Sequence, residues 1–139
     1  MNRIASSAAL TVLFAVAGAS AGPPRAPSPI RVSVVGSMAV LVHSDGRQDT
    51  MPCESLDVGR RAYFAMQLSA VRSALAHGDE LAHVEDVEAA WPRITAYNEV
   101  AALCEQGGKL VADPGTELLA HQLDKAIRRF FASVQKRSA

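Results

Sequence analysis

The stretch DTMPCESLDV, residues 49–58, marks the point where the spacing of apolar residues changes from that of strands to that of helices. Upstream of it lie two β-branched runs, IRVSVV and MAVLVH, separated by Gly36-Ser37, and the turn sequence SDGR then precedes QDTM. Two-residue Gly-Ser and Asp-Gly turns between such runs are a strong hairpin signal. The sequence therefore predicts a small antiparallel β-meander over residues 30–51, which needs another element to pack against.

Downstream of this stretch, three segments repeat their apolar residues with a helical period. They span about residues 55–78, 79–107 and 114–137, with Asp79 as the expected N-cap of the second. The apolar stripes are, in order, Leu56, Phe64, Leu68, Val71 and Leu75; Leu81, Val84, Val87, Trp91, Ile94, Tyr97, Ala101 and Cys104; and Leu119, Leu123, Ile127, Phe130 and Val134. We therefore expect an α+β protein, in which a short N-terminal β-meander is followed by a three-helix body.

Local signals indicate where these helices begin and end. Ser55 or Asp57 suits the N-cap of the first helix, and Gly78 suits its end. Asp113-Pro114 has the residue types favoured at an N-cap and at the first helical position. Pro92 lies inside the second segment, so that segment is either one helix kinked at the proline or two helices.

The first residues have the three-part layout of a secretory signal. One basic residue, Arg3, precedes an apolar run through Ala17, and small residues follow, so cleavage is expected after Ala21. The apolar run is shorter than the roughly 20 residues that a membrane-spanning helix needs, and no comparable stretch follows. We therefore expect the mature chain to be periplasmic or secreted, with no integral membrane segment.

The expected domain organisation follows from this cleavage site. Residues 1–21 form the signal, and residues 22–29 form a proline-rich leader. About 118 residues remain after cleavage, a usual size for one domain with one core. Residues 30–139 are thus predicted to be a single domain, with the meander at 30–51 and a helical part at 52–139.

The charges of the chain are balanced overall but unevenly placed. The whole chain has 14 basic and 14 acidic residues, and loss of Arg3 leaves 13 against 14, a formal charge of −1. This balance argues against a nucleic-acid-binding protein, which needs a strongly basic surface. Residues 79–105 hold seven acids against Arg93 alone, whereas residues 106–139 hold six bases against three acids. We expect the acidic and the basic segment to face each other.

Cys53 and Cys104 are the only two cysteines of the chain. In an exported domain such a pair is most economically a disulfide, and an antiparallel pairing of the first two helices would bring both positions together. A catalytic thiol is the first alternative, but Glu54 and Glu105 follow the two cysteines and disfavour a thiolate. A zinc site is the second alternative, but it would draw on histidines that show no finger-type spacing with the cysteines: His43, His77, His83 and His121.

The segment GDELAHVEDVE concentrates acidic residues and histidines. Its members, together with the preceding histidine, form a predicted acid-sensing cluster: His77, Asp79, Glu80, His83, Glu85, Asp86 and Glu88. Glu80 and His83 have the Glu-x-x-His spacing of carboxylate-bridged metal sites, whereas Glu117 and His121 are offset by four. The further inward-facing glutamates of such a site are missing, so we favour a solvated acidic helix face and expect no metal.

The sequence contains no motif that indicates an enzyme. It has no Gly-rich phosphate loop, no nucleophile elbow and no convincing catalytic triad order. Basic residues of the first and third helices could bind phosphate or a membrane surface, but such residues are more often solvated or paired with acids of a neighbouring helix. They are Arg60, Arg61, Arg72, Lys125, Arg128, Arg129, Lys136 and Arg137. We therefore expect neither catalytic activity nor a cofactor.

Three stretches of the chain carry a resemblance to a known family. MPCESLD opens the first helix, AAWPRITAYNEVAALCEQ closes the second, and KAIRRFFASVQKR lies in the third. Together, over about residues 51–137, they resemble the Hde family of periplasmic acid-stress chaperones. The resemblance implies a small exported helical protein in which one disulfide joins two helices. The β-meander has no counterpart in the family pattern, and Ser55-Leu56 replaces the aromatic residue that usually follows the first cysteine.

The resemblance and the charge pattern lead to one functional hypothesis and one alternative. At about pH 2 the mature chain would carry 13 basic residues and four charged histidines, a charge of +17, and its ion pairs would be lost. The loosened fold would expose Leu123, Phe130 and Phe131 as a client-binding surface. The alternative is a constitutive interaction module, either an accessory subunit or an inhibitor of an envelope assembly, using the hairpin edge or the third helix. The expected partner is a protein or an unfolded client, with a homodimer also expected and no nucleic acid.

Overall fold

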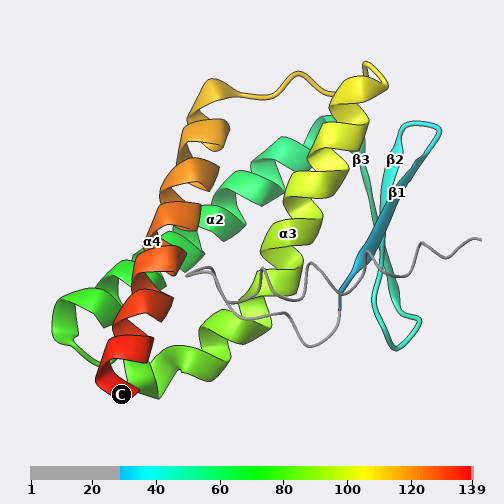
Figure 1. The fold of residues 1–139 in the computed structure, drawn as a ribbon. Helices are drawn as coiled ribbons and strands as arrows, with labels where there is room; N and C mark the ends of the chain where they lie inside the picture. The colour runs from blue at the N-terminus through cyan, green and yellow to red at the C-terminus, as the bar shows by residue number, and fades with distance from the viewer. Residues whose placement is uncertain (1–28, 139) are drawn as a thin grey trace, which may run out of the picture.

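The computed structural model describes residues 29–138 of the 139-residue chain. The predicted signal, residues 1–21, and the predicted leader up to residue 28 lie outside the described residues. Along the described chain, three strands are followed by three α-helices, with a short 3-10 helix between the first two helices (Figure 1). This order confirms the predicted α+β fold, in which a short antiparallel meander precedes a helical body.

The sheet is an antiparallel meander in the order β1-β2-β3, as the two turn sequences predict. Its strands are β1 (Arg31–Val35), β2 (Met38–Val42) and β3 (Gln48–Pro52). Gly36 has a φ of 62°, which the first tight turn requires and which glycine adopts without strain. Side chains alternate between the two faces, so Ala39 and Leu41 are fully buried on the face that packs against the helices.

The first helix, α2 (Cys53–His77), begins directly after β3 and earlier than predicted. The prediction that Ser55 or Asp57 caps this helix is wrong. The N-cap is Pro52, which has an extended backbone (φ −62°, ψ 140°) and provides no capping side chain. Gly78 ends the helix as predicted, because its left-handed backbone (φ 70°) turns the chain away from the helix axis.

The second predicted helical segment consists of two elements. A single 3-10 turn, η1 (Glu80–His83), leads into the helix α3 (Val84–Gln106), and the side chain of Asp79 caps neither of them. Leu81, which the helical period assigns to the buried stripe, lies in the 3-10 turn and is 54% exposed. Pro92 lies inside α3, which continues past it, so of the two alternatives the single helix is the one observed.

The third helix, α4 (Pro114–Ser138), begins where the sequence predicts. Asp113 Oδ2 accepts a hydrogen bond from the backbone N–H of Thr116 at 3.2 Å, which satisfies one of the free donors of the first turn. The proline at the first helical position needs no hydrogen-bond acceptor there, because it has no N–H.

Helices α2, α3 and α4 form a bundle beside the sheet (Figure 1). Arg60 contacts Glu117 near the start of α2 and α4, and Gly78 lies beside Arg137 near their ends, so these two helices run parallel. Helix α3 runs in the opposite direction and carries β1 and β2 on its outer side. The largest fully buried apolar side chains of this core are Leu41, Leu56, Phe64, Val71, Val100, Leu123, Ile127 and Phe130.

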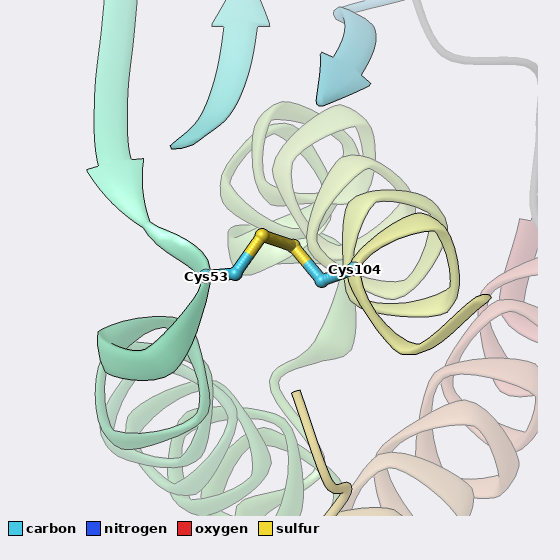
Figure 2. The surroundings of a disulfide bond; sticks show 2 residues. All are labelled: Cys53 and Cys104. Atoms are coloured by element: carbon cyan, nitrogen blue, oxygen red, sulfur yellow. A yellow bond between two sulfur atoms is a disulfide. The ribbon is translucent and has the colours of Figure 1, made fainter. Parts of the chain in front are cut away.

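A disulfide joins Cys53 to Cys104, as predicted (Figure 2). Cys53 is the first residue of α2, at the junction with β3, and Cys104 lies in the last turn of α3. The antiparallel arrangement of the two helices brings their Cα atoms to 5.8 Å, within the range that a disulfide requires. The bond closes a loop of 51 residues and links the sheet end of α2 to α3.

Candidate functional site: the contacts that hold helix α4

The predicted client-binding residues lie on the buried face of α4. Leu123 and Phe130 are fully buried, and Phe131 is 4% exposed. The two phenylalanine rings meet edge to face, with their centroids 5.1 Å apart. In the folded protein this face belongs to the hydrophobic core, so a client can reach it only after α4 has moved away from α2 and α3.

Near its start, α4 is held by an ion pair to a buried arginine of α2. The Arg60 side chain is 3% exposed, and its guanidinium donates to Glu117 Oε2 at 2.6 Å. A second nitrogen donates to Asn98 Oδ1 of α3 at 2.9 Å, and the guanidinium carbon lies 5.4 Å from the centroid of the Phe64 ring. Arg60 therefore connects all three helices through one charged group.

The neighbouring Arg61 forms a second set of contacts to the same end of α4. Its guanidinium donates to Asp113 Oδ2 at 2.6 Å and to Thr116 Oγ1 at 2.9 Å. The fully buried Thr116 hydroxyl in turn donates to Asp57 Oδ2 at 2.9 Å. We call the complete set the N-terminal contact cluster: Asp57, Arg60, Arg61, Asn98, Asp113, Thr116 and Glu117.

Near its end, α4 is held by a buried carboxylate from the 3-10 turn. Glu80 is 3% exposed, accepts a hydrogen bond from the Ser133 hydroxyl and pairs with Arg137 Nε at 3.2 Å. The Ser133 hydroxyl, the backbone amide of Glu80 and the charge of Arg137 hold the pKa of Glu80 below its usual value. We call these three residues the C-terminal contact cluster.

Glu80 is the member of the predicted acid-sensing cluster that reaches α4. His83 lies between Asp79 and Asp86, with a ring nitrogen 3.5 Å from each carboxylate, and all three side chains are exposed to solvent. His77 makes its contact within α2, where its ring Nδ1 lies 2.8 Å from the backbone oxygen of Ser73. The predicted cluster thus divides into separate local contacts.

The remaining acids of the predicted cluster, Glu85 and Glu88, form no ion pair with another described residue. The expectation that the acidic second segment faces the basic third helix holds for one pair, Glu80 with Arg137. The N-terminal contact cluster has the opposite distribution of charge. Its cations come from α2, and two of its carboxylates come from Asp113, just before α4, and from Glu117 in the first turn of α4.

The structure also bears on the alternatives for the cysteines and histidines. Both cysteines are consumed by the disulfide, so neither is a free thiol for catalysis or for zinc. Within residues 29–138, no three side chains of His, Cys, Asp or Glu lie together in a way that could hold a metal ion. Glu80, one half of the Glu-x-x-His motif, directs its carboxylate to Ser133 and Arg137 instead.

Sequence analysis did not identify Arg60 as a buried residue. The signal was nevertheless present, because Arg60 lies four residues after Leu56 and four before Phe64, on the stripe that enters the core. An arginine at such a position needs a buried partner, and Glu117 supplies it from a segment 57 residues away. Asn98 and Thr116 gave no comparable signal, since their roles depend on the packing of three helices.

Comparison with known proteins yields no match, whether to a family model, to a curated protein or to a solved structure. Among the described helices, none is both long and apolar enough to cross a membrane.

Proposed function

We propose that this protein is exported to the periplasm and binds unfolded proteins in acid, with α4 as the element that moves. One observation carries the proposal: carboxylates hold both ends of α4 over a buried apolar face. These carboxylates belong to Asp57, Asp113 and Glu117 at one end and to Glu80 at the other. The resemblance to the Hde family and the signal-like N-terminus support the same assignment.

Acid acts on the N-terminal contact cluster by removing negative charge from around a buried cation. At about pH 2 carboxylates are protonated, whereas arginine stays charged. The buried Arg60 side chain then remains in the core without an ionised partner. Loss of the Glu117 charge leaves the buried guanidinium uncompensated, which we expect to cost about 1–2 kcal/mol because half of the Glu117 side chain is exposed. Moving α4 outward returns Arg60 to water and relieves this cost.

The disulfide limits how far the fold opens. It joins α2 to α3, while α4 has no covalent link to either helix beyond the connecting chain at residues 107–113. Loss of the two contact clusters therefore releases α4 first and leaves α2, α3 and the sheet connected. The released surface includes Leu123, Phe130 and Phe131, together with the α2 residues that they cover.

An aggregation assay in acid tests this proposal. The protein is mixed with a client that unfolds and aggregates at about pH 2, and light scattering is followed with and without it. We expect suppression of scattering in acid and none at neutral pH, where α4 covers the apolar face. Equal scattering with and without the protein in acid contradicts the proposal.

Near-UV circular dichroism provides a second readout of the same event. The near-UV bands of Phe130 and Phe131, whose rings meet edge to face on the buried face of α4, depend on their packing and should fall reversibly in acid, while the far-UV helical signal is largely retained. A near-UV signal that stays constant between neutral pH and about pH 2 contradicts movement of α4.

A constitutive interaction module is the second candidate, and one observation favours it. The sheet packs against the helices with one face, while Val35 and Met38 on the other face are 65% and 36% exposed. A partner could bind this face without any conformational change. The same spectra separate the candidates, since a module of this kind keeps its near-UV signal in acid.

A further inference from the structure

A hollow lies between the β2–β3 turn and the middle of α3, on the side of the molecule that carries the sheet. Its volume is about 310 Å³, enough for a small molecule. The polar side chains that line it include His43 from the end of β2, Arg47 from the turn and Arg93 from α3. Two guanidinium groups and an imidazole ring, from the β2–β3 connection and from α3, thus line one space.

The carboxylate of Asp49 holds the side chains of His43 and Arg93 in position. Asp49 Oδ2 lies 2.8 Å from His43 Nε2 and 3.9 Å from the Arg93 guanidinium. Asp49 is not among the residues that line the hollow. The hydrogen bond with His43 holds the pKa of Asp49 below its usual value, so this anchor stays ionised.

The turn that carries Arg47 is itself well ordered by hydrogen bonds. The backbone of His43 donates to Arg47 O at 2.9 Å, and Gly46 donates back to His43 O at 2.9 Å. Asp45, the one carboxylate that lines the hollow, accepts the backbone N–H of Arg47 at 2.9 Å. Arg47 forms no ion pair with any residue of the described chain.

Apart from Ser44, the rest of the lining is apolar. Ile30 forms part of the wall from the sheet side, and Ala89 and Pro92 form part of it from α3. Pro92 also has no backbone N–H, so this part of the helix offers the hollow a hydrocarbon surface. A ligand that fits both parts of the lining carries a negative charge at one end and an apolar group at the other.

We propose that this hollow is a binding site for a small organic anion. A carboxylate or phosphate group is bound by the guanidinium groups of Arg47 and Arg93, which match its geometry. The apolar part of the ligand packs against Ile30 and Pro92. This site shares no residue with the α4 contact clusters, so a test of anion binding does not depend on the proposed function.

Titration of the isotope-labelled mature chain, residues 22–139, with benzoate tests this site when it is followed by NMR at neutral pH. Inorganic phosphate, which has the charge but no apolar part, serves as the comparison probe. We expect saturable shifts confined to amides near residues 43–47 and 89–93, with benzoate binding more tightly than phosphate. Tighter binding of phosphate overturns the assignment of an organic ligand, and shifts that do not saturate in the millimolar range overturn the site.

Three charge-neutralising variants sharpen the result. Arg47→Gln alters an exposed turn residue, and Arg93→Gln alters the second proposed ligand; each should weaken benzoate binding about tenfold or more. Arg72→Gln removes the same charge from an exposed position of α2 and should leave binding unchanged. Equal weakening by Arg72→Gln, or none by Arg47→Gln, overturns the proposal. Arg47→Gln stays decisive even if Arg93→Gln disturbs the fold, because Arg47 lies outside the core.

Discussion

The two parts of the helical bundle are held in place by different kinds of interaction. Helices α2 and α3 are joined by a covalent bond whose stabilising effect does not depend on protonation. Helix α4 is held against α2 by apolar packing and by two polar contact clusters that include four carboxylates. The same bundle thus contains one connection that is insensitive to pH and one that acid weakens.

This difference indicates which contact between helices acid should disrupt first. Carboxylates in native ion pairs lose their stabilising effect as they become protonated, whereas a disulfide keeps constraining the unfolded chain. Acid therefore acts more strongly on the α2–α4 contact than on the α2–α3 contact. Variants at the disulfide, at the start of α4 and at its end should therefore differ in how much they destabilise the fold and in how that loss depends on pH.

The largest effect is expected at the disulfide. Replacing both cysteines, Cys53→Ser with Cys104→Ser, removes the closure of a 51-residue loop and should lower the free energy of unfolding by about 4 kcal/mol. Urea unfolding at neutral pH measures this loss. In acid the double variant should also lose its far-UV helical signal, because no covalent bond then limits the separation of α2 and α3.

The wild-type protein treated with a reductant is the matched control for this variant. It should show the same loss of stability without any change of sequence. A double variant that unfolds in acid no further than the oxidised wild type contradicts the role given to the disulfide.

The next largest effect is expected at the start of α4. Glu117→Gln keeps the shape of the side chain but removes the charge that pairs with the buried Arg60 at 2.6 Å. Half of the Glu117 side chain is exposed, and Asn98 remains as a partner, so we expect a loss of about 1–2 kcal/mol at neutral pH. The loss should disappear in strong acid, where the wild-type carboxylate is itself neutral.

Asp124→Asn provides the matched control, since it removes the same charge from the same helix. Asp124 pairs with Arg128 at 3.0 Å, but both side chains are largely exposed, so its effect should stay below about 1 kcal/mol. Equal losses from the two variants, compared by urea unfolding, contradict a special role for the buried arginine.

The sequence predicted the parts of this fold that local patterns specify. The turns at Gly36-Ser37 and Asp45-Gly46, the helix end at Gly78 and the helix start at Asp113-Pro114 follow from the conformational preferences of those residues. The disulfide was predictable because the chain offers only two cysteines, in a protein expected to be exported.

The incorrect predictions arose where tertiary contacts use a residue that local patterns assign elsewhere. Asp57 has the side chain of an N-cap, yet it lies inside α2 and accepts a hydrogen bond from Thr116. Arg60 pairs with an acid of a neighbouring helix, which is one of the two expectations for the basic residues, but its burial between Glu117 and Asn98 was not predicted. The apolar stripe of α2 includes Arg60, but its partners come from α3 and α4, and no pattern within one helix identifies them.

The smallest effect at neutral pH is expected at the end of α4, where Glu80→Gln changes the pH dependence of stability. The folded-state pKa of Glu80 lies below its usual value of 4.5, so its ionised form stabilises the fold above that value. This contribution is lost as the pH falls through the folded-state pKa. Glutamine can still accept the hydrogen bond from Ser133, but it has no charge to lose. Urea midpoints measured between neutral pH and strong acid should therefore fall less steeply for the variant below about pH 5.

The two curves should converge at the acid end, because wild-type Glu80 is then neutral as well. Ser133→Ala separates the two contributions to this end of α4. It removes the hydroxyl that lowers the pKa of Glu80 most, while the ion pair with Arg137 remains. If the Glu80→Gln and wild-type curves run parallel throughout, Glu80 is a packing residue. The pH dependence of α4 would then reside at its N-terminal end alone.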